Sequence, residues 1–136
     1  MKKATILCVN DNPKSTRLLS SILEERGFHV IGAEGADEAR QIAETTSFDL
    51  ALLDYAMPKM LGTELAKEIR IVEPHVPIVV MSGLASLPDE ELLYVDAHVG
   101  RGSTLEDLIE MVSTLIGSGE TVVEAGRGPQ FRPDWT

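Results

Sequence analysis

Residues 49–58, DLALLDYAMP, hold the stretch that decides the fold: an apolar run from Leu50 to Leu53 that stops at the acidic Asp54. A short continuous apolar run that is followed by turn residues such as Pro58 is typical of a buried strand. Strands buried on both faces occur in parallel sheets, where helices cover the two faces. The stretch therefore predicts a central strand whose carboxyl end carries an acidic side chain.

Outward from this stretch, apolar runs alternate with helical patterns. Further strands are predicted at residues 4–9, 28–33, 77–81 and 97–99. Helices are predicted at residues 14–27, 36–45 and 63–73, after Pro88, and from Ser103 or Thr104 to Gly117 or Gly119. The helix after Pro88 should be short, because little apolar sequence follows its acidic first turn. In the first helix, the expected core face is Leu18, Leu19, Ile22 and Leu23.

Strands that alternate with helices predict a doubly wound α/β domain with a five-stranded parallel sheet, because each helix returns the chain for the next parallel strand. The domain is expected to cover residues 1–118. Residues 119–136 contain Gly and Pro without apolar periodicity, so they are predicted to be a flexible C-terminal tail or linker.

The bulk composition excludes several classes of function. The 22 acidic and 12 basic residues give a net charge of −10, which argues against nucleic acid and anionic membranes as partners. No apolar run approaches the roughly 18 residues of a membrane span, so a soluble, cytoplasmic protein is expected. The single cysteine, Cys8, lies in an apolar strand and is interpreted as an inert core thiol.

Polar residues follow four of the predicted strands: Asn10 and Asp11, Asp54, Ser82, and Arg101. The carboxyl ends of parallel strands share one edge of a sheet, so these side chains should converge on one pocket. Any one of the acids alone is as well explained as a solvated loop residue or a helix cap. Their joint placement after four strands favours a functional site.

The chemistry that these residue types support is phosphoryl transfer. Asp11, Asp54 and the backbone carbonyl of Ala56 are suitable oxygen ligands for Mg²⁺. With the cation neutralising charge, the Asp54 carboxylate is a candidate nucleophile toward a phosphoryl group. Ser82 is a candidate hydrogen-bond donor to one phosphoryl oxygen, and Arg101 is a candidate partner for another.

With these motifs, residues 3–117 resemble the receiver domains of bacterial two-component response regulators of the chemotaxis-regulator type. Residues 4–13 are similar to the first strand and acidic turn of that family, and residues 49–58 to its phosphoacceptor segment. The resemblance implies a flavodoxin-like sheet of order 2-1-3-4-5 and a switch rather than a turnover enzyme. It implies that Asp54 is phosphorylated, that Asn10, Asp11, Asp54 and Ala56 surround Mg²⁺, and that Ser82 follows the phosphoryl group.

The same resemblance implies partners. A sensor histidine kinase or a phosphotransfer protein would supply the phosphoryl group, and a downstream protein that the sequence does not identify would read the switch. A homodimer through the face of the fourth and fifth helices is left open.

The sequence departs from the family pattern at several positions. Asn10 stands where the family has a second acid, and Arg101-Gly102 stands where lysine and a cis-proline are usual. His98 occupies the position of an aromatic switch residue, and it could serve that role or be a partly exposed histidine without a special task. The segment from Ser82 to Arg101 is about one helical turn short.

These departures support one alternative, a phosphorylation-independent pseudo-receiver that acts as a protein-interaction module. A magnesium-dependent phosphohydrolase with an aspartate nucleophile would also place an acid at a strand end. Such an enzyme needs a general acid two residues after its nucleophile, and that position is Ala56. The sequence therefore argues against hydrolase activity.

Overall fold

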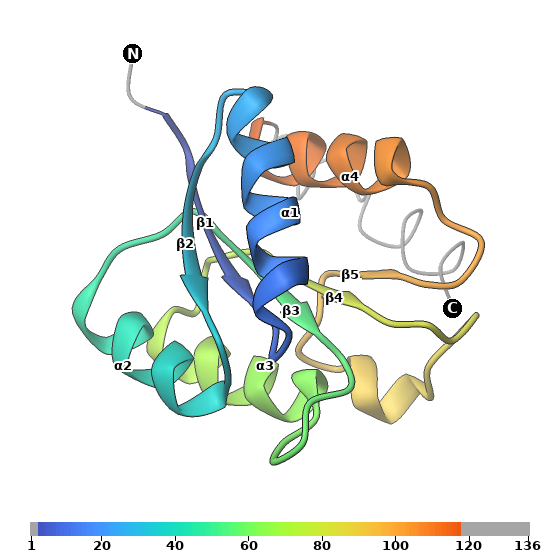
Figure 1. Cartoon of the computed structure of the whole chain (residues 1–136). Coiled ribbons are helices and arrows are strands. Elements are labelled where there is room, and N and C mark those ends of the chain that lie inside the picture. Colours follow the sequence, from blue (N-terminus) through green and yellow to red (C-terminus); the bar gives the residue numbers. More distant parts are fainter. Residues whose placement is uncertain (1–2, 118–136) are drawn as a thin grey trace.

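A five-stranded parallel sheet lies at the centre of the structure, a computed structural model that describes residues 3–117 (Figure 1). The strands are β1 (Thr5–Val9), β2 (His29–Ala33), β3 (Leu50–Asp54), β4 (Ile78–Met81) and β5 (Ala97–Val99). Their order across the sheet is β2-β1-β3-β4-β5, and every neighbouring pair is parallel. The predicted fold class and strand order are confirmed.

Helices cover both faces of the sheet. They are α1 (Pro13–Glu25), α2 (Ala36–Thr45), α3 (Gly62–Val72) and α4 (Leu105–Gly117). Figure 1 shows α1 and α4 on one face and α2 and α3 on the other. Each face has its own buried apolar cluster, one built around Cys8 and Leu52 and the other around Leu7 and Leu53. Alternate residues of β1 and β3 therefore enter opposite cores.

The first helix corrects one detail of the predicted core. Leu23 is fully buried, but Leu18 is 63% exposed. At about 100° per residue, Leu18 lies about 140° around the helix from Leu23, which places it on the flank of the buried stripe. The periodicity predicted the correct face but extended it one residue too far.

The fourth helical segment is a single 3-10 turn, η1 (Asp89–Leu92), so residues 3–117 contain four α-helices instead of five. Pro88 precedes the turn, and its start is acidic as predicted. Leu87, Leu92 and Val95 are buried in the same core as α2 and α3. Because the chain must place these apolar side chains within nine residues and then enter β5, no room remains for a longer helix.

The last helix begins at a reciprocal cap. The Thr104 backbone N–H donates to Asp107 Oδ2 at 2.8 Å, and the Asp107 N–H donates to Thr104 Oγ1 at 3.0 Å. Of the two predicted caps, Thr104 is therefore the one used, and the helix extends to Gly117, the last residue that the structure describes. The predicted tail, 119–136, lies outside the described residues. Among the residues that are described, no helix is long and apolar enough to cross a membrane.

Candidate functional site at the carboxyl ends of the strands

The strand order reverses between β1 and β3, because β1 connects to β2 on one side while β3 leads to β4 on the other. A crevice forms outside the carboxyl ends of strands at such a point. Asp54 is the last residue of β3, and Asn10 and Asp11 follow β1, which ends level with Leu53. The predicted convergence of Asp11 and Asp54 is therefore what the topology produces.

Asp54 lies in an electrostatically unfavourable place for a negative charge. Partial burial, repulsion from Asp11 and a hydrogen bond to the Asp11 side chain raise its pKa to about 6, although the Tyr55 backbone N–H opposes the shift. Within residues 3–117, no group of three or more His, Cys, Asp or Glu side chains is arranged to hold a metal. Asp11 and Asp54 therefore form an acidic pair rather than a larger carboxylate cluster.

Asn10 has a structural task in the turn after β1. It is 8% exposed, and its side-chain oxygen accepts the Asn12 backbone N–H at 2.9 Å. Its own N–H donates to the Ala33 carbonyl at 3.1 Å, which joins the turn to the end of β2. Asn12 in turn caps α1 by accepting the Lys14 N–H at 3.0 Å. The amide of Asn10 thus fixes the loop that carries Asp11.

The loop after Asp54 depends on a glycine. Gly62 N–H donates to the Tyr55 carbonyl at 2.8 Å and closes the loop that contains Ala56. A Cβ atom at position 62 would lie 2.3 Å from the Asp54 carbonyl oxygen, closer than real Cβ contacts allow. Gly62 therefore permits the close approach of α3 to the end of β3.

Ser82 and His98 are joined at the neighbouring edge of the sheet. Ser82 Oγ lies 2.6 Å from His98 Nε2, and His98 is 1% exposed. The interpretation of His98 as a partly exposed histidine is wrong, because helices cover both faces of the sheet and every residue of β5 is buried. Its apolar neighbours Ala97 and Val99 were the signal for this burial.

Arg101 lies on the loop after β5, beside the segment that follows Ser82. Its backbone N–H donates to the Leu84 carbonyl at 2.8 Å, and its side chain is exposed. Gly102 has a φ of +98°, a conformation that glycine adopts without strain. No cis peptide bond occurs among the residues that the structure describes. The loop is shaped by glycine and by the hydrogen bond to Leu84.

A further contact near Asp54 escaped the sequence reasoning. The Tyr55 hydroxyl donates to Glu91 Oε1 at 2.7 Å, and the Thr63 hydroxyl donates to the same oxygen at 3.3 Å. Glu91 belongs to η1, so the residue after Asp54 is connected to that turn. No local pattern indicates a pairing between residues that are 36 positions apart.

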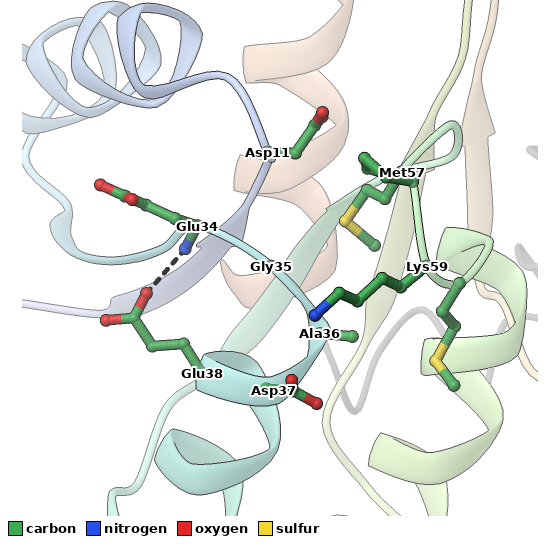
Figure 2. A pocket seen from close by; sticks show the side chains of 10 residues that line it. Asp11, Glu34, Gly35, Ala36, Asp37, Glu38, Met57 and Lys59 are labelled. Carbon is green, nitrogen blue, oxygen red and sulfur yellow. Dashed lines mark hydrogen bonds between the residues drawn. The ribbon is translucent and has the colours of Figure 1, made fainter.

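A pocket of about 270 Å³ lies beside Asp11 on the side of α2, and Asp54 is not among the residues that line it. Figure 2 shows Asp11 and Met57 on one side, Glu34 and Glu38 on another, and the Lys59 side chain extending toward Ala36. The Glu34 backbone N–H donates to Glu38 Oε1 at 2.8 Å. Asp11 therefore faces an open pocket whose other walls are residues 34–38, after β2, and residues 57–60, after β3.

The comparisons with known proteins agree with this geometry. Residues 6–99 match the family model of the response regulator receiver domain. The transcriptional regulatory protein GlrR of Escherichia coli is 33% identical over 65% of this chain, and the matched region is 20% of its own length.

Two solved structures of the response regulator TrrA from Thermotoga maritima also match. In complex with Mg²⁺-BeF, TrrA is 29% identical, with a TM-score of 0.76 over 82% of this chain and 98% of that chain. In complex with the histidine kinase ThkA, it is 30% identical, with a TM-score of 0.76 over 83% and 98%. The chain therefore belongs to the response regulator receiver domain family.

Proposed function

We propose that this receiver domain accepts a phosphoryl group on Asp54 from a phosphohistidine of a sensor histidine kinase or phosphotransfer protein, and that the transfer changes its affinity for a downstream protein. The observation that carries the proposal is the pairing of a half-buried Asp54 with Asp11 at the carboxyl ends of β1 and β3. The resemblance to TrrA, which was solved both with a histidine kinase and with Mg²⁺-BeF, supports it.

The reaction proposed for Asp54 is an in-line displacement. An Asp54 carboxylate oxygen forms a bond to phosphorus while the bond between phosphorus and the donor nitrogen breaks. The Ser82 hydroxyl and the Arg101 guanidinium are proposed to contact phosphoryl oxygens. The loop closed by Gly62 holds the nucleophile on a rigid strand end, which reduces the entropic cost of alignment.

The residues at the site fit a magnesium ion. Asp11, Asp54 and the Ala56 carbonyl are hard oxygen donors, and a divalent cation would offset the burial and the repulsion from Asp11 that raise the pKa of Asp54. When bound, Mg²⁺ neutralises charge between the nucleophile and the incoming phosphoryl group. Asn10 supplies one charge fewer than an acid would, so weak binding of Mg²⁺ is expected.

The test is intact mass spectrometry after incubation with a small-molecule phosphodonor, with and without Mg²⁺. The wild type should gain one phosphoryl group only with Mg²⁺, and Asp54→Ala should gain none. Asp89→Asn, which removes an exposed carboxylate from η1, is the matched control and should behave as wild type.

A folded wild type that gains no phosphoryl group at any Mg²⁺ concentration would contradict the proposal. The phosphorylation-independent interaction module would then be the better account of Arg101-Gly102 and the short η1. The cytoplasmic location predicted from the sequence is part of the same proposal. Asp54 must share a compartment with the phosphohistidine that donates the phosphoryl group.

A further inference from the structure

One carboxylate oxygen in η1 joins the two ends of the loop between β3 and α3. Glu91 Oε1 accepts the Tyr55 hydroxyl at 2.7 Å and the Thr63 hydroxyl at 3.3 Å. Tyr55 comes immediately before the loop, residues 56–61, and Thr63 lies in the first turn of α3, which follows the loop. Glu91 therefore closes the loop through side chains, beside the backbone bond from Gly62 to Tyr55.

The surroundings of Glu91 favour these two hydrogen bonds. Thr63 is 5% exposed, and its hydroxyl donates to Glu91. A buried hydroxyl is costly to leave without a partner, so the bond to Glu91 is not readily exchanged. Glu91 is itself partly buried, and water competes less for its oxygen than it would at an open surface.

The turn η1 gives Glu91 a fixed support. The apolar side chains on either side of Glu91 are buried in the core beside α3: Leu87, Leu92 and Val95. Arg70 of α3 also donates to the Tyr94 carbonyl at 3.1 Å, shortly after the turn. Because η1 is anchored to the core and to α3, the hydrogen bonds to Glu91 restrain the loop rather than the turn.

The restrained loop carries the backbone group expected to bind Mg²⁺. Ala56 is the first residue of the loop and directly follows Tyr55. The Tyr55 N–H donates to the Met81 carbonyl at 2.8 Å, and the Tyr55 carbonyl accepts the Gly62 N–H at 2.8 Å. With the bond from its hydroxyl to Glu91, Tyr55 is fixed on β4, on α3 and on η1. The direction of the chain into Ala56 is set by these three bonds.

We propose that Glu91 is a positioning residue for the magnesium site, because it fixes both ends of the loop that presents the Ala56 carbonyl. This inference rests on the magnesium site of the proposed function. Without the two hydrogen bonds the loop has more conformations, and binding of Mg²⁺ must include the cost of ordering it. Glu91 acts through Tyr55 and Thr63, and no covalent bond changes.

The test measures the affinity of the full chain for Mg²⁺ by NMR titration. Glu91→Ala removes the acceptor of both hydroxyl groups and should weaken Mg²⁺ binding by about two- to tenfold, the equivalent of one ordinary hydrogen bond. Tyr55→Phe keeps the ring and should weaken Mg²⁺ binding in the same direction. Glu91→Gln keeps an acceptor oxygen without the charge, and its affinity should be close to that of the wild type.

Two comparisons separate positioning from charge. Glu90→Ala removes a neighbouring exposed carboxylate from η1 and should leave the affinity close to that of the wild type. In a Tyr55→Phe/Thr63→Val background, which lacks both hydroxyl groups, Glu91→Ala should weaken binding no more than Glu90→Ala does. Equal affinities of wild type and Glu91→Ala would overturn the inference, and so would a Glu91→Gln variant that binds no better than Glu91→Ala.

Amide hydrogen exchange reports on the loop in the absence of any cation. The Gly62 N–H closes the loop on the Tyr55 carbonyl, and it should exchange about two- to tenfold faster in Glu91→Ala than in the wild type. Glu91→Gln should restore the protection of this amide. Equal exchange rates in the wild type and Glu91→Ala would show that Glu91 does not hold the loop, which contradicts the inference.

The mass experiment on Asp54 distinguishes the two failures. Phosphoryl gain by the wild type, together with an affinity for Mg²⁺ that does not depend on Glu91, overturns only this inference. Absence of phosphoryl gain removes the proposed function, and the Mg²⁺ affinities and the exchange of the Gly62 amide then still decide the role of Glu91.

Discussion

The carboxyl groups of Asp11 and Asp54 lie side by side at the ends of β1 and β3, and burial together with this proximity holds the pKa of Asp54 at about 6. The nucleophile in phosphoryl transfer is the ionised carboxylate. At a low Mg²⁺ concentration, the initial rate of phosphoryl uptake should therefore fall as the pH is lowered through about 6. The rate is measured by intact mass, and the pKa by ¹³C NMR of the Asp54 carboxyl group without Mg²⁺.

Asp11→Asn provides the control for this pH dependence. Without repulsion from Asp11, the pKa of Asp54 should fall, but burial, the larger cause, should keep it above its usual value of 3.8. An Asp54 pKa that is the same in Asp11→Asn and in the wild type would show that the two carboxyl groups do not interact in solution.

The same pKa shift predicts how stability depends on pH. The folded pKa of Asp54, about 6, is above the unfolded value of 3.8, so ionisation is harder in the folded protein. Below pH 3.8 the group contributes nothing, and between about pH 4 and 6 its cost grows to a plateau. Asp54→Asn should therefore raise the free energy of unfolding at pH 7.5, by about 1 kcal/mol because the group is partly solvated.

Urea denaturation at several pH values checks this expectation. The gain from Asp54→Asn should shrink as the pH is lowered toward 4, and Asp89→Asn should show no such trend. A gain that is independent of pH would mean that the substitution acts through packing rather than through charge.

A substitution at Gly62 gives a prediction that depends only on steric contact and not on charge. Gly62→Ala places a Cβ atom 2.3 Å from the Asp54 carbonyl oxygen, and backbone must move to relieve the contact. The variant should be less stable by about 1–3 kcal/mol, as for other overpacked sites, and its phosphoryl uptake should be slower. Gly35→Ala, where a Cβ atom meets nothing within 4 Å, is the matched control. Equal stabilities of the two variants in urea would contradict the close approach.

Much of the fold was predictable from the sequence because four of the five strands, all except β2, are buried on both faces. Apart from Asp54 and His98, the residues that form β3 and β5 are apolar, and their predicted bounds, 50–54 and 97–99, agree with the structure. Since the strands are parallel, their carboxyl ends meet at one edge, and this placed Asp11 and Asp54 together without knowledge of the side chains.

The parts of the site that could not be predicted depend on tertiary contacts. Asn10 was interpreted through its missing charge, whereas the structure shows its amide in a turn. His98 was identified as a switch position, but its bond to Ser82 depends on the register of β4 and β5. The link from Tyr55 to Glu91 depends on how short η1 is, which places an acidic side chain over the loop after β3.

The hydrogen bond between Tyr55 and Glu91 gives the last prediction. The pKa of the Tyr55 hydroxyl is raised because it donates to Glu91 and because the negative charge of Glu91 disfavours the phenolate. Glu91→Gln removes the charge, so the pKa of Tyr55 should fall, as measured by ultraviolet titration in a Tyr94→Phe background that leaves Tyr55 as the single tyrosine. Glu90→Gln, at the neighbouring exposed acid, should have a smaller effect. If the two substitutions give the same pKa of Tyr55, Glu91 of η1 does not bind the Tyr55 hydroxyl in solution. A movement of the loop after Asp54 would then not be transmitted to η1 through this contact.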